Sequence, residues 1–204
     1  MRTGEVYHLN DIAVEVEAGR VARALGLGEG ESHPRLKAAL EETDRICRLG
    51  AAYRLESLRR EQGAIILGGD LRVESLSLNR FFEGSTAALL MAATLEDGGT
   101  SRMEELATEG RMDELYFVDA VVSEMVDRGL DVVRGLVDRR IRDRGWAVTR
   151  RRFSPGYGDV DLDLQYALFR RLDLGSLGMR ILPSRMLVPE KSVIALAGIE
   201  ERRG

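Results

Sequence analysis

Residues 87–95 read Ala-Ala-Leu-Leu-Met-Ala-Ala-Thr-Leu, a continuous run of small and apolar side chains. Gly84 stands before this run, and Gly98 and Gly99 follow it. A short apolar run between turn residues is typical of a strand that is buried on both faces. We therefore expect residues 87–95 to lie inside a sheet whose two faces are both covered.

A long helical pattern follows, from about residue 111 to residue 144. Gly129 and Gly135 interrupt it, and each weakens a helix by about 1 kcal/mol relative to alanine. They are tolerable where a neighbouring element packs closely against the helix. The apolar positions recur at helical spacing and mark one broad face: Leu115, Val118, Val122, Met125, Val126, Leu130, Val133, Leu136, Val137 and Ile141.

Shorter patterns on both sides complete the predicted fold. Ser32 and Pro34 are typical of a helix start, and Gly68-Gly69 is typical of a turn between two strands. The predicted elements are a strand at 5–9, a helix at 32–49, two strands within 64–73, a strand at 146–153, a loop at 154–160, a helix at 161–173, and strands at 179–182 and 192–199. Helices and strands without regular βαβ alternation predict an α+β fold. We expect one domain over residues 1–204, with a twisted, mainly antiparallel sheet flanked by helices.

The composition excludes several classes of protein. The chain has 204 residues, 44% of them hydrophobic, and can bury a core without a disulfide or a metal. Its 30 basic and 34 acidic residues argue against a nucleic-acid binder. One cysteine, Cys47, favours a reducing compartment. There is no apolar run long enough for a membrane helix and no signal-like start, so we expect a cytoplasmic protein without a membrane partner.

Familiar catalytic and cofactor motifs are missing. His8 and His33 with Cys47 do not supply the ligand set of a zinc site. The sequence has neither a Gly-x4-Gly-Lys phosphate loop nor a Gly-x-Ser-x-Gly nucleophile elbow. The glycine-rich stretch 26–30 follows a helical segment rather than a strand, so we interpret it as a connection between helices.

The most unusual segment is Arg152-Phe153-Ser154-Pro155-Gly156-Tyr157-Gly158. Pro155 fixes φ and Gly156 permits a positive φ, so the chain can bend sharply and expose main-chain groups to a ligand. Arg152 could grip a carboxylate with a bidentate bond. Tyr157 offers a ring face to an adenine or to a cation such as a sulfonium. On residue types alone, an ordinary strand-to-helix turn with a surface arginine is the favoured interpretation of the segment.

Three blocks together resemble the activation domain of cobalamin-dependent methionine synthase. Residues 152–157 are similar to its Arg-x-x-Pro-Gly-Tyr motif. Residues 178–193 resemble its Gly-Met-x-Leu-Thr-Glu-Ser-x-x-Met-x-Pro-x-x-Ser-Val block. Residues 90–95 and 116–120 are similar to segments of stand-alone relatives. The resemblance covers residues 85–204, and the role of residues 1–84 stays open.

The resemblance implies a set of S-adenosylmethionine contacts. Arg152 would hold the methionyl carboxylate, and Ser154 would contact adenine through its main chain. Gly156 and Tyr157 would face the ligand and the corrin ring. Asp127 falls where the family has a glutamate near the ligand, with Glu124 as the rival position.

Three departures put ligand affinity in question. Glu96 stands where stand-alone relatives have glycine, and Pro183 stands where the synthase domain has glutamate. The synthase domain's C-terminal tyrosine has no counterpart here. His8 and His33 also lack the Asp-x-His-x-x-Gly context of a corrinoid carrier.

The function that the resemblance implies is reactivation of a partner's cobalamin. Such a domain presents the methyl group of S-adenosylmethionine to cob(II)alamin on a corrinoid-binding methionine synthase subunit, while flavodoxin or ferredoxin supplies one electron. It would act as a component of that methyltransferase rather than as an enzyme alone. Two alternatives stay open: activation of another corrinoid methyl-transfer protein, and a non-catalytic module that binds a corrinoid protein without using S-adenosylmethionine. An unrelated methyltransferase is disfavoured, since no glycine-rich loop follows a first strand.

Overall fold

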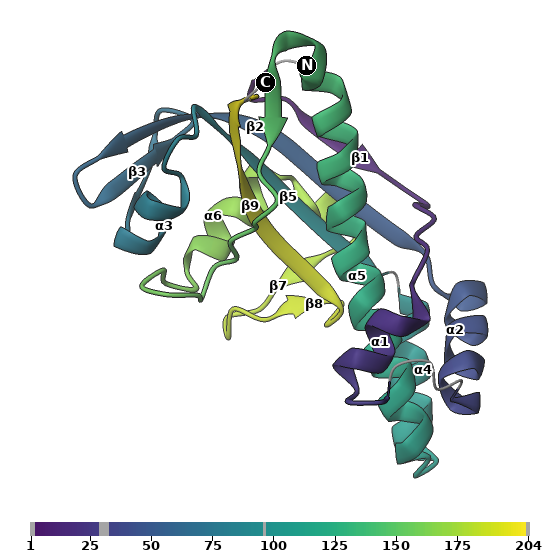
Figure 1. Ribbon diagram of the computed structural model, residues 1–204. Coiled ribbons are helices and arrows are strands. Elements are labelled where there is room, and N and C mark those ends of the chain that lie inside the picture. Colours follow the sequence, from purple (N-terminus) through teal and green to yellow (C-terminus); the bar gives the residue numbers. More distant parts are fainter. Residues whose placement is uncertain (1–2, 29–32, 96, 203–204) are drawn as a thin grey trace.

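Helices and strands follow one another irregularly in the computed structural model, which describes residues 3–28, 33–95 and 97–202 (Figure 1). In chain order the elements are β1 (Val6–Leu9), α1 (Ala18–Ala24), α2 (Pro34–Ile46), β2 (Leu49–Glu61), β3 (Ala64–Leu67), β4 (Leu71–Glu74), α3 (Leu76–Phe81), β5 (Ala87–Leu95), α4 (Asp97–Thr108), α5 (Met112–Ile141), η1 (Arg142–Arg144), β6 (Trp146–Val148), α6 (Leu164–Arg171), η2 (Leu174–Leu177), β7 (Arg180–Ile181), β8 (Leu187–Val188) and β9 (Ser192–Glu201). The helix start at Ser32, the stretch 29–30 and Glu96 lie outside the described residues.

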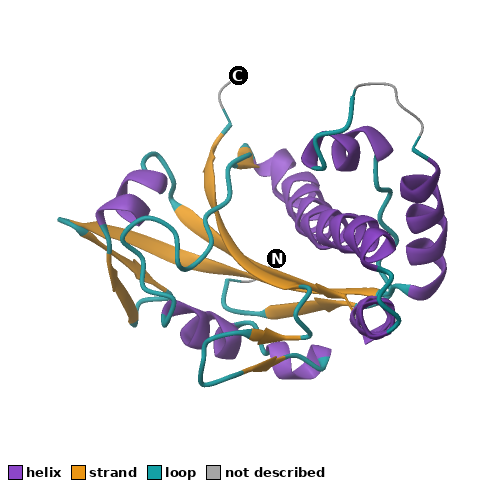
Figure 2. Ribbon diagram, turned by 90° about the horizontal axis from the view of Figure 1, so that it is seen from below, coloured by secondary structure: helices purple, strands orange, loops and turns teal. Residues whose placement is uncertain are grey.

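A seven-stranded sheet organises the molecule. Its strand order is β4-β3-β2-β5-β9-β6, and β1 pairs with the first part of β2. All of the pairings are antiparallel. Helices α1, α2, α4 and α5 cover one face, while α3, α6 and the β7–β8 hairpin lie on the other (Figure 2). The predicted α+β fold with an antiparallel sheet flanked by helices is confirmed.

Strand β5 runs through the middle of this sheet, between β2 and β9. Leu89, Met91 and Ala93 pack into the cluster beneath α5, and Leu90 and Ala92 pack into the cluster on the opposite face. The uninterrupted apolar run at 87–95 is therefore explained by burial on both sides.

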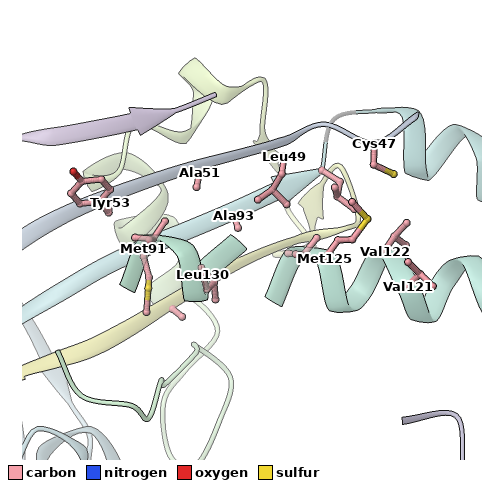
Figure 3. Packing of buried hydrophobic residues seen from close by; sticks show 14 of the residues in the cluster. Cys47, Leu49, Ala51, Tyr53, Met91, Ala93, Val121, Val122, Met125 and Leu130 are labelled. Carbon is pink, nitrogen blue, oxygen red and sulfur yellow. The ribbon is translucent and has the colours of Figure 1, made fainter. Parts of the chain in front are cut away.

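Helix α5 lies close against the sheet at one glycine. A Cβ atom added at Gly129 would stand 2.5 Å from Cδ2 of Leu49 and 3.0 Å from Cβ of Ala93. Figure 3 shows Leu49 and Ala93 beside the helix, next to Met125 and Leu130. At Gly135 the nearest atom to an added Cβ is the flexible Nη1 of Arg139, at 3.5 Å. Gly129 therefore allows α5 to pack closely against the sheet. Gly135 has no such role, because a side chain there would meet only Arg139.

The longest strand, β2, was not anticipated from the sequence. Its second half carries charged residues, and Glu56 among them is only 2% exposed. Nε of Arg54 lies 2.7 Å from the Glu56 carboxylate, and Nη1 of Arg171 in α6 lies 2.9 Å from it. These two cations compensate the buried carboxylate, which explains how a charged segment becomes a central strand.

The strand predicted at 146–153 ends earlier than expected. β6 stops at Val148, and Phe153 forms an isolated bridge to Leu196. Between them, the hydroxyl of Thr149 accepts a hydrogen bond from the main-chain N–H of Gly198 at 3.0 Å. Because a side chain takes this donor, the regular ladder is broken there. No helix in the described part of the chain is long and apolar enough to cross a membrane.

Candidate functional site

The segment 152–160 runs along the edge of the sheet beside β9. Phe153 and Leu196 exchange main-chain hydrogen bonds of 2.9 and 2.8 Å, which hold the segment against that strand. The chain then turns at Gly156, whose φ of 88° favours glycine. The N–H of Gly156 donates to the carbonyl of Val160 at 3.2 Å and closes the turn. The predicted loop at 154–160 is therefore an ordered turn fixed at both ends.

Asp159 attaches this turn to the start of α3. Its carboxylate accepts hydrogen bonds from the hydroxyl of Ser75 at 2.5 Å and from the main-chain N–H groups of Leu76 at 2.7 Å and Ser77 at 3.1 Å. The Ser75 hydroxyl foremost, together with these N–H groups, holds the pKa of Asp159 well below its usual range. The ionised carboxylate is thus part of what fixes the turn.

We expect an Asp159→Asn variant to lose stability in a pH-dependent way. Because the pKa of Asp159 is lowered on folding, its stabilising effect is present above the pKa of the unfolded chain, about 3.9, and is lost as the pH falls further. The melting temperature should therefore differ most between wild type and variant near neutral pH, and the difference should shrink in acid. Thermal melting monitored by circular dichroism, from neutral pH to below the pKa of the unfolded chain, measures this difference. Asp143→Asn, an exposed aspartate in η1, is the control; a difference independent of pH would contradict the assignment.

Arg152 and Asp127, two of the predicted ligand contacts, lie together and bind each other. Nη2 of Arg152 donates to both carboxylate oxygens of Asp127 at 2.7 Å. Nη1 donates to the Asp127 carbonyl at 3.1 Å and to the carboxylate of Asp131 at 3.2 Å. The Arg152 side chain is 20% exposed and that of Asp127 is 43% exposed. The pair joins the segment 152–160 to α5 and remains open to solvent on the aspartate side.

The rival carboxylate, Glu124, faces a different partner. Its Oε1 lies 2.8 Å from Nε of Arg20 in α1. Burial raises the pKa of Glu124, and the nearby Arg20 acts against that effect. Glu124 therefore connects α5 to α1, and of the two carboxylates predicted from the sequence Asp127 is the one that contacts Arg152.

A cleft of about 310 Å³ opens next to the turn. That volume falls at the lower end of the range typical of small-molecule pockets. Its walls come from the turn, α6, the β7–β8 hairpin and the start of β9: Ser154, Pro155, Leu162, Gln165, Arg185, Met186, Leu187, Glu190, Ser192, Val193 and Ile194. The two sequence blocks at 152–157 and 178–193 thus meet in space and share one cleft.

The turn between β8 and β9 is held rigidly at the rim of this cleft. Nζ of Lys191 lies 2.7 Å from the Asp119 carboxylate and donates to the Ser123 hydroxyl at 3.0 Å, both on α5. The hydroxyls of Ser192 and Thr94 are hydrogen-bonded at 2.7 Å. These bonds hold Lys191 and Ser192 in place, and the residue before them, Glu190, is exposed and lines the cleft.

The predicted residues occupy three different places. Ser154 lines the cleft, whereas Arg152 and Asp127 form the ion pair beside it. Gly156 makes the turn, and Tyr157 points outward with 69% of its surface exposed. Their roles as ligand contacts stay predictions.

Arg185, Glu190 and Asp131 belong to the site but were not singled out from the sequence. Arg185 and Glu190 lie within the block 178–193, but they are not among the positions that the family pattern specifies. Asp131 lies one helical turn after Asp127, so a search of the helix for carboxylates at this spacing would have found it. The departure at Pro183 lies in the exposed turn between β7 and β8.

Comparison with known proteins supports the fold. No family model matches the sequence, and no curated protein matches it. Among solved structures the chain is similar to a crystal structure of the MetH reactivation domain bound to AdoHcy, with a TM-score of 0.65 and 12% sequence identity. The likeness covers 95% of this chain and 78% of that chain. The chain therefore has the fold of that domain, and the fold that the sequence resemblance implied is confirmed.

Proposed function

We propose that this chain, which has the fold of the MetH reactivation domain, binds S-adenosylmethionine and presents its methyl group to a cobalamin carried by a partner methionine synthase subunit. One observation carries the proposal: the two blocks that resemble the family meet at a single cleft, with Ser154 and Pro155 on one wall and residues 185–194 on the others. A domain of the same fold has been crystallised with AdoHcy, the demethylated form of this ligand.

Each predicted residue has a place in this proposal. The ligand lies in the cleft against Ser154, and its methionyl end extends to Arg152 and Asp127. Since Arg152 now holds the Asp127 carboxylate, the ligand's carboxylate replaces Asp127 as its bidentate partner. The released Asp127, which is already part-exposed, then accepts the ligand's ammonium group. This exchange replaces one charge-assisted pair by two.

The protein's contribution to the reaction is orientation. The methyl acceptor would be the cobalt of the partner's cobalamin, after one-electron reduction by flavodoxin or ferredoxin. The bond between the methyl group and the sulfonium sulfur would break, and AdoHcy would be the leaving group. Transfer of a methyl group in this way needs no acid or base. Holding the sulfonium methyl in line with its acceptor lowers the barrier by several kcal/mol. In this proposal the cleft and the turn at 154–160 hold the ligand in that orientation.

Exposed apolar side chains near the cleft provide a surface for the partner. Tyr157 stands on the turn, Leu182 on the β7–β8 hairpin, and Met186 on the wall of the cleft itself; all three are exposed. Large exposed apolar residues on the segments that form a cleft favour a surface that another molecule covers. We place the corrin ring of the partner over these residues.

The ion pair of Arg152 also supports a second candidate. Because Asp127 and Asp131 already satisfy the guanidinium, a chain that binds a corrinoid protein without S-adenosylmethionine would keep this same arrangement. In that case the 152–160 segment serves only to shape the docking surface. The client can be a methionine synthase subunit or another corrinoid methyl-transfer protein under either candidate.

Calorimetric titration separates these functions. Purified protein is titrated with S-adenosylmethionine, alone and in the presence of a cob(II)alamin-bearing partner, and methylcobalamin formation is followed by visible absorbance with a reduced flavodoxin or ferredoxin. Saturable binding and methylation support reactivation. Tight association with the corrinoid protein, but no binding of S-adenosylmethionine under either condition, would instead establish the non-catalytic module.

A further inference from the structure

The cleft beside the 152–160 segment has an uneven charge. Among its lining residues, all of which the structure describes, Arg185 and Glu190 are the charged ones. Arg185 forms an ion pair with Asp163, which does not line the cleft, so its charge is compensated. Glu190 has no ion pair or side-chain hydrogen bond with any described residue. The cleft therefore presents one uncompensated negative charge.

Neighbouring cations do not cancel that charge. Lys191 follows Glu190 directly in sequence, but its Nζ lies 2.7 Å from Asp119 on α5. Arg152 is held by Asp127 and Asp131. Lys191 and Arg152 are therefore both paired with carboxylates other than Glu190. A positively charged ligand in the cleft gains a favourable interaction with Glu190, and a neutral ligand of the same shape does not.

We infer that Glu190 is a specificity-determining residue that makes this cleft prefer a sulfonium ligand over the corresponding thioether. The inference rests on the proposed function and deepens it. S-adenosylmethionine carries a positive sulfur, and AdoHcy carries a neutral one, while their other groups are the same. Glu190 then favours binding of the methyl donor and release of the demethylated product.

The size of this preference follows from electrostatics in a cleft that is open to water. At a separation of several ångströms and an intermediate effective dielectric, a unit charge pair changes affinity on the order of tenfold. Screening reduces the effect as salt is added, because the Debye length falls from about 10 Å at 0.1 M to about 3 Å at 1 M. A preference caused by shape alone would not depend on salt.

The test is a set of titrations with S-adenosylmethionine and with AdoHcy, using wild type, Glu190→Gln and Glu201→Gln. Glu201 is the last residue of β9, whereas Glu190 lies just before the first; Glu201 is exposed and does not line the cleft, so its substitution controls for the loss of one negative charge. We expect wild type and Glu201→Gln to prefer the sulfonium by on the order of tenfold at low salt. Glu190→Gln should lose most of that preference by binding S-adenosylmethionine more weakly, with AdoHcy binding nearly unchanged.

The outcomes distinguish the inference from the proposed function. A Glu190→Gln variant that keeps the wild-type ratio, or that weakens both ligands equally, overturns the inference and leaves the proposed function standing. If wild type binds neither ligand, with or without a corrinoid partner, the proposed function fails and the inference fails with it. A ligand that carries an ammonium-bearing carbon in place of the sulfonium should behave like S-adenosylmethionine in every variant.

Discussion

Replacing Arg152 with alanine is expected to weaken S-adenosylmethionine binding by roughly 30- to 150-fold, which corresponds to about 2–3 kcal/mol. Nη2 of Arg152, which now donates to both carboxylate oxygens of Asp127, is the group proposed to bind the ligand's carboxylate, and such charge-assisted hydrogen bonds are stronger than neutral ones. Calorimetric titration measures the effect directly. Arg152→Lys should recover only part of the affinity, because an ammonium lacks the planar array of N–H donors that a guanidinium presents to a carboxylate.

The fold should survive the loss of Arg152. Asp127 is part-exposed and can be hydrated, and Asp131 keeps ion pairs with Arg128 and Arg134. An unchanged melting temperature would therefore show that a loss of affinity comes from the missing side chain and not from unfolding. Arg151→Ala is the matched control, since Arg151 is an exposed neighbour and does not line the cleft. Equal affinity in wild type and Arg152→Ala would show that Arg152 does not contact the ligand and would contradict its proposed role.

The second large effect concerns stability. Gly129→Ala is expected to destabilise the protein by about 1–3 kcal/mol, although alanine is the better helix former. The added methyl group would lie 2.5 Å from Leu49 and 3.0 Å from Ala93, so α5 has to move away from the sheet or Leu49 has to leave its position. Both neighbours belong to the buried cluster shown in Figure 3, which leaves little room for adjustment.

Gly135→Ala on the same helix provides the matched comparison. Only the mobile Arg139 side chain comes near an added methyl group there, so the gain in helix propensity should stabilise the protein by about 0.5–1 kcal/mol. Chemical denaturation of the two variants measures both values. We expect the free energy of unfolding to fall in Gly129→Ala and to rise in Gly135→Ala. Equal changes at both positions would show that the close approach at Gly129 does not limit the packing.

Much of the fold could be predicted from local patterns. The apolar run at 87–95 became the buried strand β5, and the periodic stretch 111–144 became α5. Gly68 and Gly69, both with positive φ, form the turn between β3 and β4 as expected. These elements carry their own signal, because periodicity, turn residues and burial all agree within one short segment.

Elements whose stability depends on distant partners were missed or misplaced. β2 carries a charged second half, and its strand form depends on Arg171 from α6 to compensate Glu56. β6 ends at Val148 because Thr149 takes the N–H of Gly198, about fifty residues away in sequence. Neither interaction can be seen in the local pattern, so the sequence predicted no strand in the first case and too long a strand in the second.

By itself, the sequence determined the fold class, the buried strand, the long helix, and the two blocks that resemble a known family. These are properties of residue order, because apolar spacing and turn chemistry act over a few neighbouring positions. Only the tertiary structure decided that the two blocks share one cleft, that Arg152 is already held by Asp127, and that no described residue forms an ion pair with Glu190. Charge compensation acts through space, and the chain brings these groups together only when β9, α5 and the 152–160 segment have packed.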